Sequence, residues 1–222
     1  MSKSKGNSAV ETISLRDQIH NNLRKMLIRN ELAPSSRIIE AELSSQLGIS
    51  RTPLREALFK LEQEGFIKSN LAKGFTVNAL SVREVRELYP IIWTLEGLAI
   101  NLSSSRLHNV IKELKNINRD FAKVIGRPEK SIALDNAFHC TLTNQCQNKH
   151  LLSQLGTLKN LVYRYEFAYM REPGCPDESV EYHNQIIDAI AKNNLNQAIK
   201  IVEQNWRIGM NRISQWLDWS IQ

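Results

Sequence analysis

Apolar residues recur at helical spacing in three segments near the start of the chain. The segments are residues 15–30, a short stretch at about 40–47, and residues 54–61. Apolar side chains three and four positions apart line one face of a helix, so each segment predicts an amphipathic helix. Ser14 suits the N-cap of the first helix, and Gly48 suits the residue that ends the second.

Behind the third helix, which ends at Gly65, the pattern becomes that of short strands. Residues 66–68 and 74–77 are rich in β-branched and aromatic side chains and are separated by a turn, which predicts a β-hairpin. Helix, helix, tight turn, helix and hairpin follow one another in a winged helix-turn-helix. We therefore predict such a domain over residues 11–78, behind a flexible polar tail at residues 1–10.

From Val82 onward the pattern favours helices alone, and breaks rich in Pro, Gly and Asn divide it into six. Short connections favour antiparallel neighbours, so residues 82–220 should form a second, all-helical domain, an antiparallel bundle. The predicted fold is mainly α, with an N-terminal winged helix-turn-helix plus a C-terminal antiparallel six-helix bundle. The helices are expected at about residues 82–106, 108–126, 129–147, 149–172, 177–193 and 195–219.

Composition narrows the class of protein. The 222 residues include 29 Lys and Arg against 23 Asp and Glu, and the net charge of +6 suits a polyanionic partner. No apolar run approaches the ~20 residues of a membrane-spanning helix, and the start lacks a signal peptide, which favours a cytoplasmic protein without membrane contact. Cys140, Cys146 and Cys175 are odd in number and lack CxxC spacing, which indicates reduced thiols.

The residues that follow Gly48 carry the strongest functional signal. The glycine permits a tight turn, and Ser50 and Pro53 favour a helix start. A helix-turn-helix points this end of its last helix into the major groove, where arginine can read guanine and hydroxyl groups can bind phosphate. Taken singly, each arginine could equally be a solvated surface residue. The candidate DNA-binding residues are Ser50, Arg51, Thr52 and Arg55, with Lys68, Lys73 and Gly74 in the hairpin.

Residues 48–58, Gly-Ile-Ser-Arg-Thr-Pro-Leu-Arg-Glu-Ala-Leu, resemble the signature of the GntR family of bacterial regulators. The resemblance covers about residues 12–78. It implies a homodimer bound to a short pseudo-palindromic operator of double-stranded DNA, with Arg51 and Arg55 contacting bases. Some members carry a basic residue where this chain has Ala41, so no base contact is expected there.

The helical half, about residues 82–219, resembles the ligand-binding FCD domain of the FadR-type subgroup. Six helices rather than seven are similar to its VanR-like branch. The resemblance is carried by Leu95-Glu96-Gly97-Leu98-Ala99, by Asp135 with Phe138-His139, by Asn148 with Leu151, and by residues 183–191.

Asp135 and His139 are four residues apart, so on a helix they share a face and could hold one metal ion. The resemblance implies a divalent metal held by such a pair and two further histidines. His183 matches one of these, whereas Asn205 stands where the other is expected. The candidate metals are Zn, Ni and Mn, although an amide oxygen binds zinc or nickel more weakly than imidazole does. Alternatively, the same residues form a polar network or hold an organic ligand directly.

The effector is expected to be a small organic metabolite such as an organic acid. Related domains often carry an arginine three residues before the Leu-Glu pair, where this chain has Ile92. This difference favours a less acidic or more apolar effector, or another cation such as Arg164. We therefore assign Arg164 and Asn205 to the effector pocket, while a surface position for Arg164 is equally compatible with the sequence.

These observations predict a sequence-specific DNA-binding transcription regulator, by default a repressor, whose operator affinity depends on an effector. The alternative is a regulator whose helical domain only dimerises, without effector or metal. An enzyme is not predicted, because the sequence contains no HExxH, nucleophile elbow, Walker loop or Rossmann glycine pattern.

Overall fold

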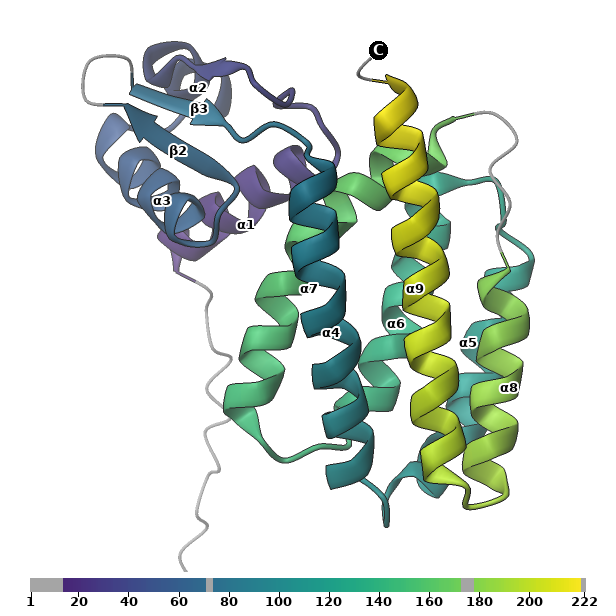
Figure 1. Cartoon of the computed structure of the whole chain (residues 1–222). Coiled ribbons are helices and arrows are strands. Elements are labelled where there is room, and N and C mark those ends of the chain that lie inside the picture. Colours follow the sequence, from purple (N-terminus) through teal and green to yellow (C-terminus); the bar gives the residue numbers. More distant parts are fainter. Residues whose placement is uncertain (1–13, 71–73, 173–177, 221–222) are drawn as a thin grey trace, which may run out of the picture. The chain divides into compact units, whose positions relative to one another are not determined.

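The computed structural model describes residues 14–70, 74–172 and 178–220. The chain divides into two compact units. The first consists of Met1–Leu27 and Ser35–Asn78, and the second of Ile28–Pro34 and Ala79–Gln222. Both were expected to be mainly helical, and the structure confirms this class (Figure 1).

The first unit has the predicted helix-turn-helix. Its three helices bury the apolar face that the spacing predicts, with Leu23, Leu54 and Leu58 fully buried. The side-chain hydroxyl of Ser14 accepts a hydrogen bond from the Asp17 amide at 3.1 Å and caps the first helix. The helices are α1 (Leu15–Ile28), α2 (Glu40–Leu47) and α3 (Arg51–Gln63).

A small antiparallel sheet with strand order β1-β3-β2 completes this unit. The hairpin of β2 (Ile67–Asn70) and β3 (Gly74–Val77) agrees with the prediction. Strand β1 (Arg37–Ile38) was not predicted, because two residues are too short to show a period-two pattern. Phe75 of β3 is buried, and its ring centroid lies 5.4 Å from that of Phe59 on α3.

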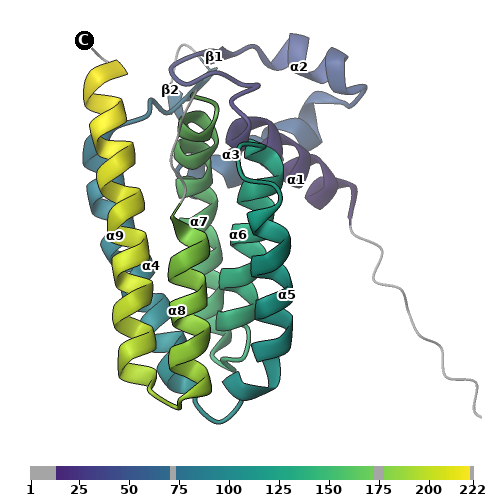
Figure 2. The same cartoon turned by 90° about the vertical axis from the view of Figure 1, so that its right-hand side faces the viewer.

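The described part of the second unit forms the predicted antiparallel six-helix bundle (Figure 2). Helix α9 packs on both α4 and α8, and α5 packs on α6 and α8. A short 3₁₀-helix, η1 (Leu107–Val110), precedes the second helix of the bundle. The helices are α4 (Val82–Leu102), α5 (Ile111–Ala122), α6 (Pro128–Thr143), α7 (Lys149–Met170), α8 (Ser179–Ala191) and α9 (Leu195–Ser220).

Helices α4 and α9 approach closely at Gly97. A Cβ atom on this glycine would lie 3.0 Å from the Ile199 side chain, closer than ordinary van der Waals contact. The absent side chain therefore lets the two helices meet, and this brings Glu96 on α4 within hydrogen-bond distance of Trp206 on α9.

Residues 28–34 belong with the helical unit, although the sequence placed them in the domain of residues 11–78. Ile28 packs against a buried cluster on α6 and α7, and Asn30 Nδ2 donates a hydrogen bond to the Arg164 carbonyl oxygen at 3.3 Å. Such contacts between distant parts of the chain leave no local pattern in the sequence. The cluster consists of Ile132, Tyr163 and Phe167.

Several predictions fall outside the described residues, namely the tail at residues 1–10, the hairpin residue Lys73 and Cys175. Cys140 and Cys146 are free thiols. Within the described ranges, none of the helices has the length and apolarity that a membrane span requires.

The conformation of Gly48 yields a stability prediction. Its φ is +64°, and its amide donates to the Ser45 carbonyl oxygen at 3.2 Å where α2 ends. Gly48→Ala should lower the free energy of unfolding by about 1 kcal/mol, because a Cβ atom is disfavoured in the left-handed region. Gly156→Ala is the control, since this glycine lies inside α7 with open space around it. Denaturant unfolding should show loss for the first variant only, and equal stability of both would contradict the assigned turn.

Candidate functional site

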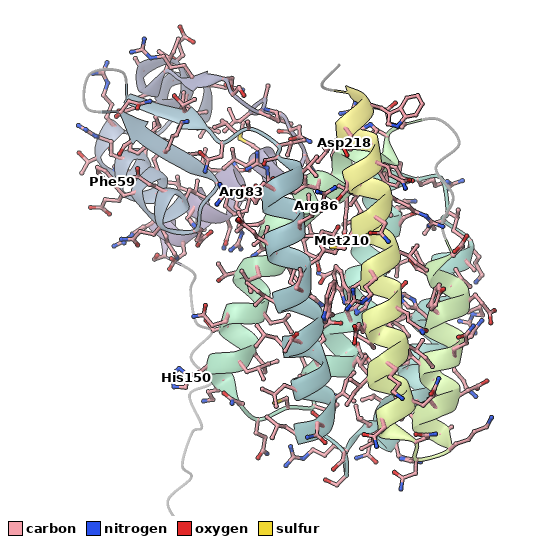
Figure 3. The ribbon with its side chains drawn as sticks, in the orientation of Figure 1. Phe59, Arg83, Arg86, His150, Met210 and Asp218 are labelled. Atoms are coloured by element: carbon pink, nitrogen blue, oxygen red, sulfur yellow. The ribbon has the colours of Figure 1, made fainter. Side chains whose placement is uncertain are left out.

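The first turn of α3 presents its polar residues outward. Arg51, Thr52 and Arg55 are exposed, and Ser50 is the N-cap residue. Arg55 Nε lies 3.5 Å from Glu40 Oε2 on α2, and its guanidinium lies 5.9 Å from the ring centroid of Phe59, which Figure 3 labels. A carboxylate partner therefore holds Arg55 along the helix surface in the free protein.

The hairpin places its basic candidate on the same unit. Lys68 on β2 is exposed, and Gly74 has a φ of +72° where β3 begins. The left-handed conformation suits glycine and starts the returning strand. The structure thus describes two of the three hairpin candidates.

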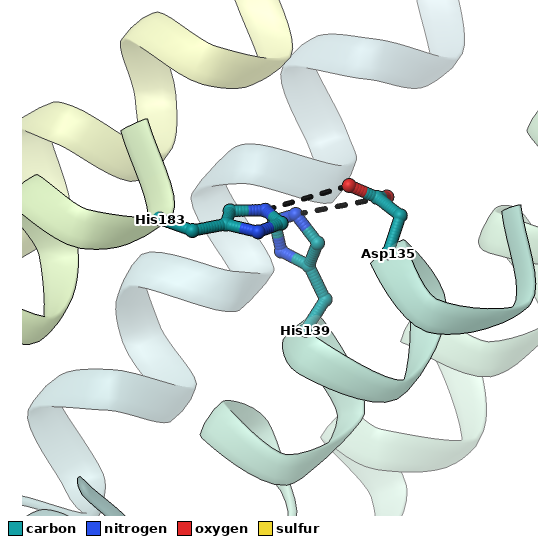
Figure 4. A group of neighbouring side chains, drawn as sticks. All are labelled: Asp135, His139 and His183. Carbon is teal, nitrogen blue, oxygen red and sulfur yellow. Dashed lines mark ion pairs between the residues drawn. The ribbon is translucent and has the colours of Figure 1, made fainter. Parts of the chain in front are cut away.

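In the helical unit the three predicted metal ligands lie together (Figure 4). Asp135 and His139 lie one turn apart on α6, and His183 comes from α8. Asp135 Oδ1 is 3.4 Å from His183 Nε2, and Asp135 Oδ2 is 4.0 Å from His139 Nε2. One donor atom of each residue lies within 4.8 Å of the others, so the three side chains could hold one ion.

Each imidazole ring has an oxygen atom within hydrogen-bond distance of its Nδ1 atom. His139 Nδ1 lies 2.8 Å from Glu96 Oε2, and His183 Nδ1 lies 3.0 Å from Asn118 Oδ1. The Asn118 amide nitrogen donates to other groups, which directs its oxygen toward the ring. An Nδ1–H bound to oxygen leaves Nε2 with its lone pair, the form in which histidine binds metal. Both Nε2 atoms accordingly face Asp135.

Aromatic stacking fixes the second ring further. The Phe138 and His183 rings are parallel within 7°, with centroids 3.7 Å apart. His183 is fully buried, so rotation of its ring would require Phe138 to move as well. The histidine geometry is therefore preorganised by packing as well as by hydrogen bonds.

A buried ion pair supports the site. Glu96 is fully buried and accepts a hydrogen bond from Trp206 Nε1 at 2.8 Å, while its other oxygen pairs with the Lys159 ammonium. Burial raises the pKa of Glu96, but its interactions with His139 and Lys159, hydrogen bonds included, outweigh this effect and bring the pKa to about 2. Glu96 is therefore a carboxylate at neutral pH. Lys159 also lies 5.6 Å from the Trp206 ring centroid.

Asp135 is likewise kept ionised. Burial raises the pKa of its carboxyl group, but the interactions with His183, His139 and Lys159 lower it below the ordinary value. The fourth candidate, Asn205 on α9, lies with its side-chain amide 3.5 Å from His139 Nε2. The atom at this distance is the amide nitrogen Nδ2, and a half-turn of the amide group would bring its oxygen toward His139 as a further donor.

A cavity of about 470 Å³ opens beside these residues. Asp135, His139 and Asn205 form part of its wall, and tyrosine and aliphatic side chains of α4, α7, α8 and α9 form much of the rest. Two arginines, Arg171 and Arg212, also line it. The cavity therefore combines ionisable groups with an apolar interior.

Arg164, which the sequence assigned to the effector pocket, is not among the described residues that line this cavity. It lies two positions before Glu166, which does line the cavity, and side chains two positions apart point to nearly opposite sides of a helix. Arg164 is buried elsewhere, with its guanidinium 5.6 Å from the Tyr165 ring centroid. Burial lowers the pKa of this guanidinium, while the charge of Glu84 raises it.

Comparison with known proteins identifies both units. Residues 15–77 match the family described as bacterial regulatory proteins, gntR family, and residues 87–207 match the FCD domain. The chain belongs to the GntR family. This GntR protein, with its FCD domain, is a DNA-binding transcription regulator and not an enzyme, as the sequence predicted.

Its relatives carry the same kind of name. The uncharacterized HTH-type transcriptional regulator YdhC of Bacillus subtilis is 28% identical over 80% of this chain and 81% of its own length. The Nta operon transcriptional regulator of Aminobacter aminovorans is 34% identical over 64% of this chain and 68% of its own. The solved structure of E. coli McbR/YncC has a TM-score of 0.80 at 22% identity, covering 93% of this chain and 100% of that one, so the fold is shared.

The sequence interpretation missed the groups behind the histidines. The sequence offered one sign of Lys159, because this charged residue lies on the apolar face of α7 with Leu155 and Val162. Lysine at such a position needs a buried anionic partner. Glu96 was noted only as part of a family motif, because its partners lie on other helices.

The Glu96–Lys159 pair predicts a large stability effect. Lys159→Met should lower the free energy of unfolding by about 3–5 kcal/mol, because it leaves a buried carboxylate without its cation. The double variant Glu96→Gln/Lys159→Met should recover part of this loss, since neither charge remains. Lys115→Met, at an exposed position on α5, is the matched control. Urea titration of the three variants measures their free energies of unfolding. Equal stability of Lys159→Met and Lys115→Met would rule out a structural role for the Glu96–Lys159 pair.

Proposed function

We propose that this regulator is a repressor whose affinity for operator DNA depends on a small organic acid bound in the helical unit beside a divalent metal ion. The observation that carries this proposal is the cluster of Asp135, His139 and His183, of which Asp135 and His139 line a 470 Å³ cavity. A cavity of this size suits a small metabolite. One relative, 29% identical over 68% of this chain and 67% of its own length, is named a probable D-xylose utilization operon transcriptional repressor, which supports repression.

The donor set fits a divalent metal. One carboxylate oxygen and two imidazole Nε2 atoms are donors that zinc, nickel and manganese accept, and Asn205 offers an amide oxygen. The oxygen atoms behind both Nδ1 atoms support the same assignment, because ligating histidines are typically held this way. When bound, the ion would supply the positive charge that attracts an effector carboxylate.

For DNA binding we assign the base contacts to the exposed start of α3. Arg51 and Arg55 can each donate two hydrogen bonds to a guanine edge, and the hydroxyl groups beside them suit phosphates. Arg55 must leave Glu40 to do so, and an ion pair with one half-exposed partner is weak enough to exchange. The full set is Ser50, Arg51, Thr52 and Arg55, with Lys68, Lys73 and Gly74 of the hairpin toward the DNA backbone.

A homodimer would present two α3 helices to two half-sites. An exposed apolar stripe on α4 supports such an assembly, since Ile91, Leu98 and Leu102 are 47%, 44% and 50% exposed. Their spacing of seven and four residues is that of a helix–helix seam. Exposed apolar stripes of this kind mark interfaces more often than solvated surface.

Helix α7 supplies a route from the cavity to the linker. Glu166 lines the cavity, and the adjacent Tyr165 accepts a hydrogen bond from the Ser81 amide at 3.2 Å and contacts Glu84. Ser81 caps α4 at the point where the linker enters the helical unit. An effector that binds one position of α7 better than another would shift the population of linker arrangements and so change DNA affinity.

Metal binding gives the first test. Zinc or nickel at 100 times its Kd should stabilise the wild-type chain by about 2.7 kcal/mol in thermal unfolding. Asp135→Ala and His183→Ala should abolish the gain, whereas His150→Ala at an exposed site should keep it (Figure 3). Elemental analysis after dialysis gives the stoichiometry. Failure of every divalent ion to bind would favour a helical unit that only dimerises.

DNA binding gives the second test. An operator is first selected from random duplexes with the wild-type chain, and an inverted repeat is expected. Arg55→Ala should then weaken binding by about 1–3 kcal/mol per half-site on the operator, with little effect on random DNA. Lys68→Ala should weaken both and reduce the salt slope by about 1. Arg83→Ala, at an exposed site on α4, is the control (Figure 3). Equal losses on both duplexes for Arg55→Ala would refute base reading.

A further inference from the structure

A guanidinium lies at a distance from the histidines within the same cavity. Arg212 follows Asn205 by seven residues on α9, so both side chains project from one face of the helix. Their Cα atoms are therefore about 10 Å apart along the helix axis. Because both residues line the cavity, the cavity extends along roughly two turns of α9.

The wall between these two residues includes several apolar groups. Ile208 and Gly209 lie between them on α9, and Tyr169 and Met170 contribute from α7. A Cβ atom on Gly209 would meet the Tyr89 ring at 3.7 Å, so the glycine leaves this wall open. The Tyr89 hydroxyl lies 3.5 Å from Glu166 Oε1, and Glu166 lines the same cavity. The cavity is thus polar near Asn205 and near Arg212, and the stretch between them combines apolar groups with the Glu166 carboxylate.

Arg212 already binds a carboxylate in this structure. Its Nη2 lies 2.9 Å from Glu178 Oε1, and Glu178 lines the same cavity just before α8. The side chain of Arg212 is 22% exposed and that of Glu178 is 58% exposed. Glu178 can therefore move into solvent when another anion competes with it for the Arg212 guanidinium.

The second lining arginine differs in its surroundings. Arg171 is exposed at the end of α7, with its guanidinium 5.8 Å from the Phe167 ring centroid. Arg212 is more enclosed, and charge-assisted hydrogen bonds strengthen as water is excluded. Arg212 is accordingly the better placed of the two for anion recognition.

We infer that Arg212 determines effector specificity by binding a second anionic group. The effector is then an elongated dianion, such as a straight-chain dicarboxylate, with an apolar spacer. One carboxylate lies beside Asp135, His139 and His183, and the other replaces Glu178 on Arg212. The inference rests on the proposed function of this cavity and adds the chemical class of its ligand.

The test uses the full-length, zinc-loaded chain and titration calorimetry. The probes are straight-chain dicarboxylates from succinate to suberate, each paired with the monocarboxylate of equal carbon number. In the wild-type chain, affinity should peak at one chain length and exceed that of the paired monocarboxylate about tenfold, as one additional charge-assisted contact predicts.

The variants separate Arg212 from the rest of the cavity. Arg212→Met should bring the ratio of dicarboxylate to monocarboxylate affinity close to one and leave monocarboxylate binding unchanged. Arg212→Lys should keep part of the preference, since the charge remains without the planar fork. Glu178→Gln should raise dicarboxylate affinity alone, because the competing carboxylate is gone. Arg207→Met removes an exposed guanidinium paired with Glu203 on the same helix and should change nothing.

Two results would overturn the inference in different ways. Monocarboxylates that bind as tightly as dicarboxylates, or a preference that survives in Arg212→Met, would exclude Arg212 as the second anion site and leave the proposed metal and carboxylate function standing. A wild-type chain that binds zinc but no carboxylate would overturn this inference together with the organic-acid effector.

Discussion

One buried carboxylate constrains the helical unit. Glu96 is fully buried, and an ion taken out of water is destabilising by several kcal/mol unless partners surround it. Its partners come from three other helices, His139 on α6, Lys159 on α7 and Trp206 on α9. A shift of one turn, about 5.4 Å, in any of these helices would remove one of the partners. The ion pair therefore specifies the register of four helices more than it adds to their stability.

The same carboxylate sets the chemistry of the site. By holding His139 at Nδ1, Glu96 turns Nε2 toward Asp135, and Asn118 does the same for His183. Neither Glu96 nor Asn118 is among the described residues that line the cavity, so the helix packing determines the donor geometry from outside it. The geometry of the proposed metal donors and the register of the bundle thus follow from one set of contacts.

Local spacing explains which features the sequence could predict. Helical periodicity is enough to place the bundle helices, and a separation of four residues is enough to bring His139 close to Asp135. Strand β1 pairs with β3 through two residues, too few for a pattern. Lys159 and Glu96 meet only after α4 and α7 pack, and the exclusion of Arg164 from the cavity depends on how α7 is rotated. Such features follow from packing between distant segments, which periodicity does not encode.

Three ion pairs in this protein differ in burial, and burial decides whether their partners can be exchanged. The Glu96–Lys159 pair has exposures of 0% and 4%, so its partners cannot exchange without opening the core. Arg55 with Glu40 and Arg212 with Glu178 each include one side chain that is more than half exposed. Breaking such a pair costs about 1 kcal/mol or less, while the carboxylate keeps the guanidinium extended and oriented. The two arginines proposed to bind DNA and an anionic ligand, Arg55 and Arg212, are therefore held by partners that an incoming phosphate, base or carboxylate can replace.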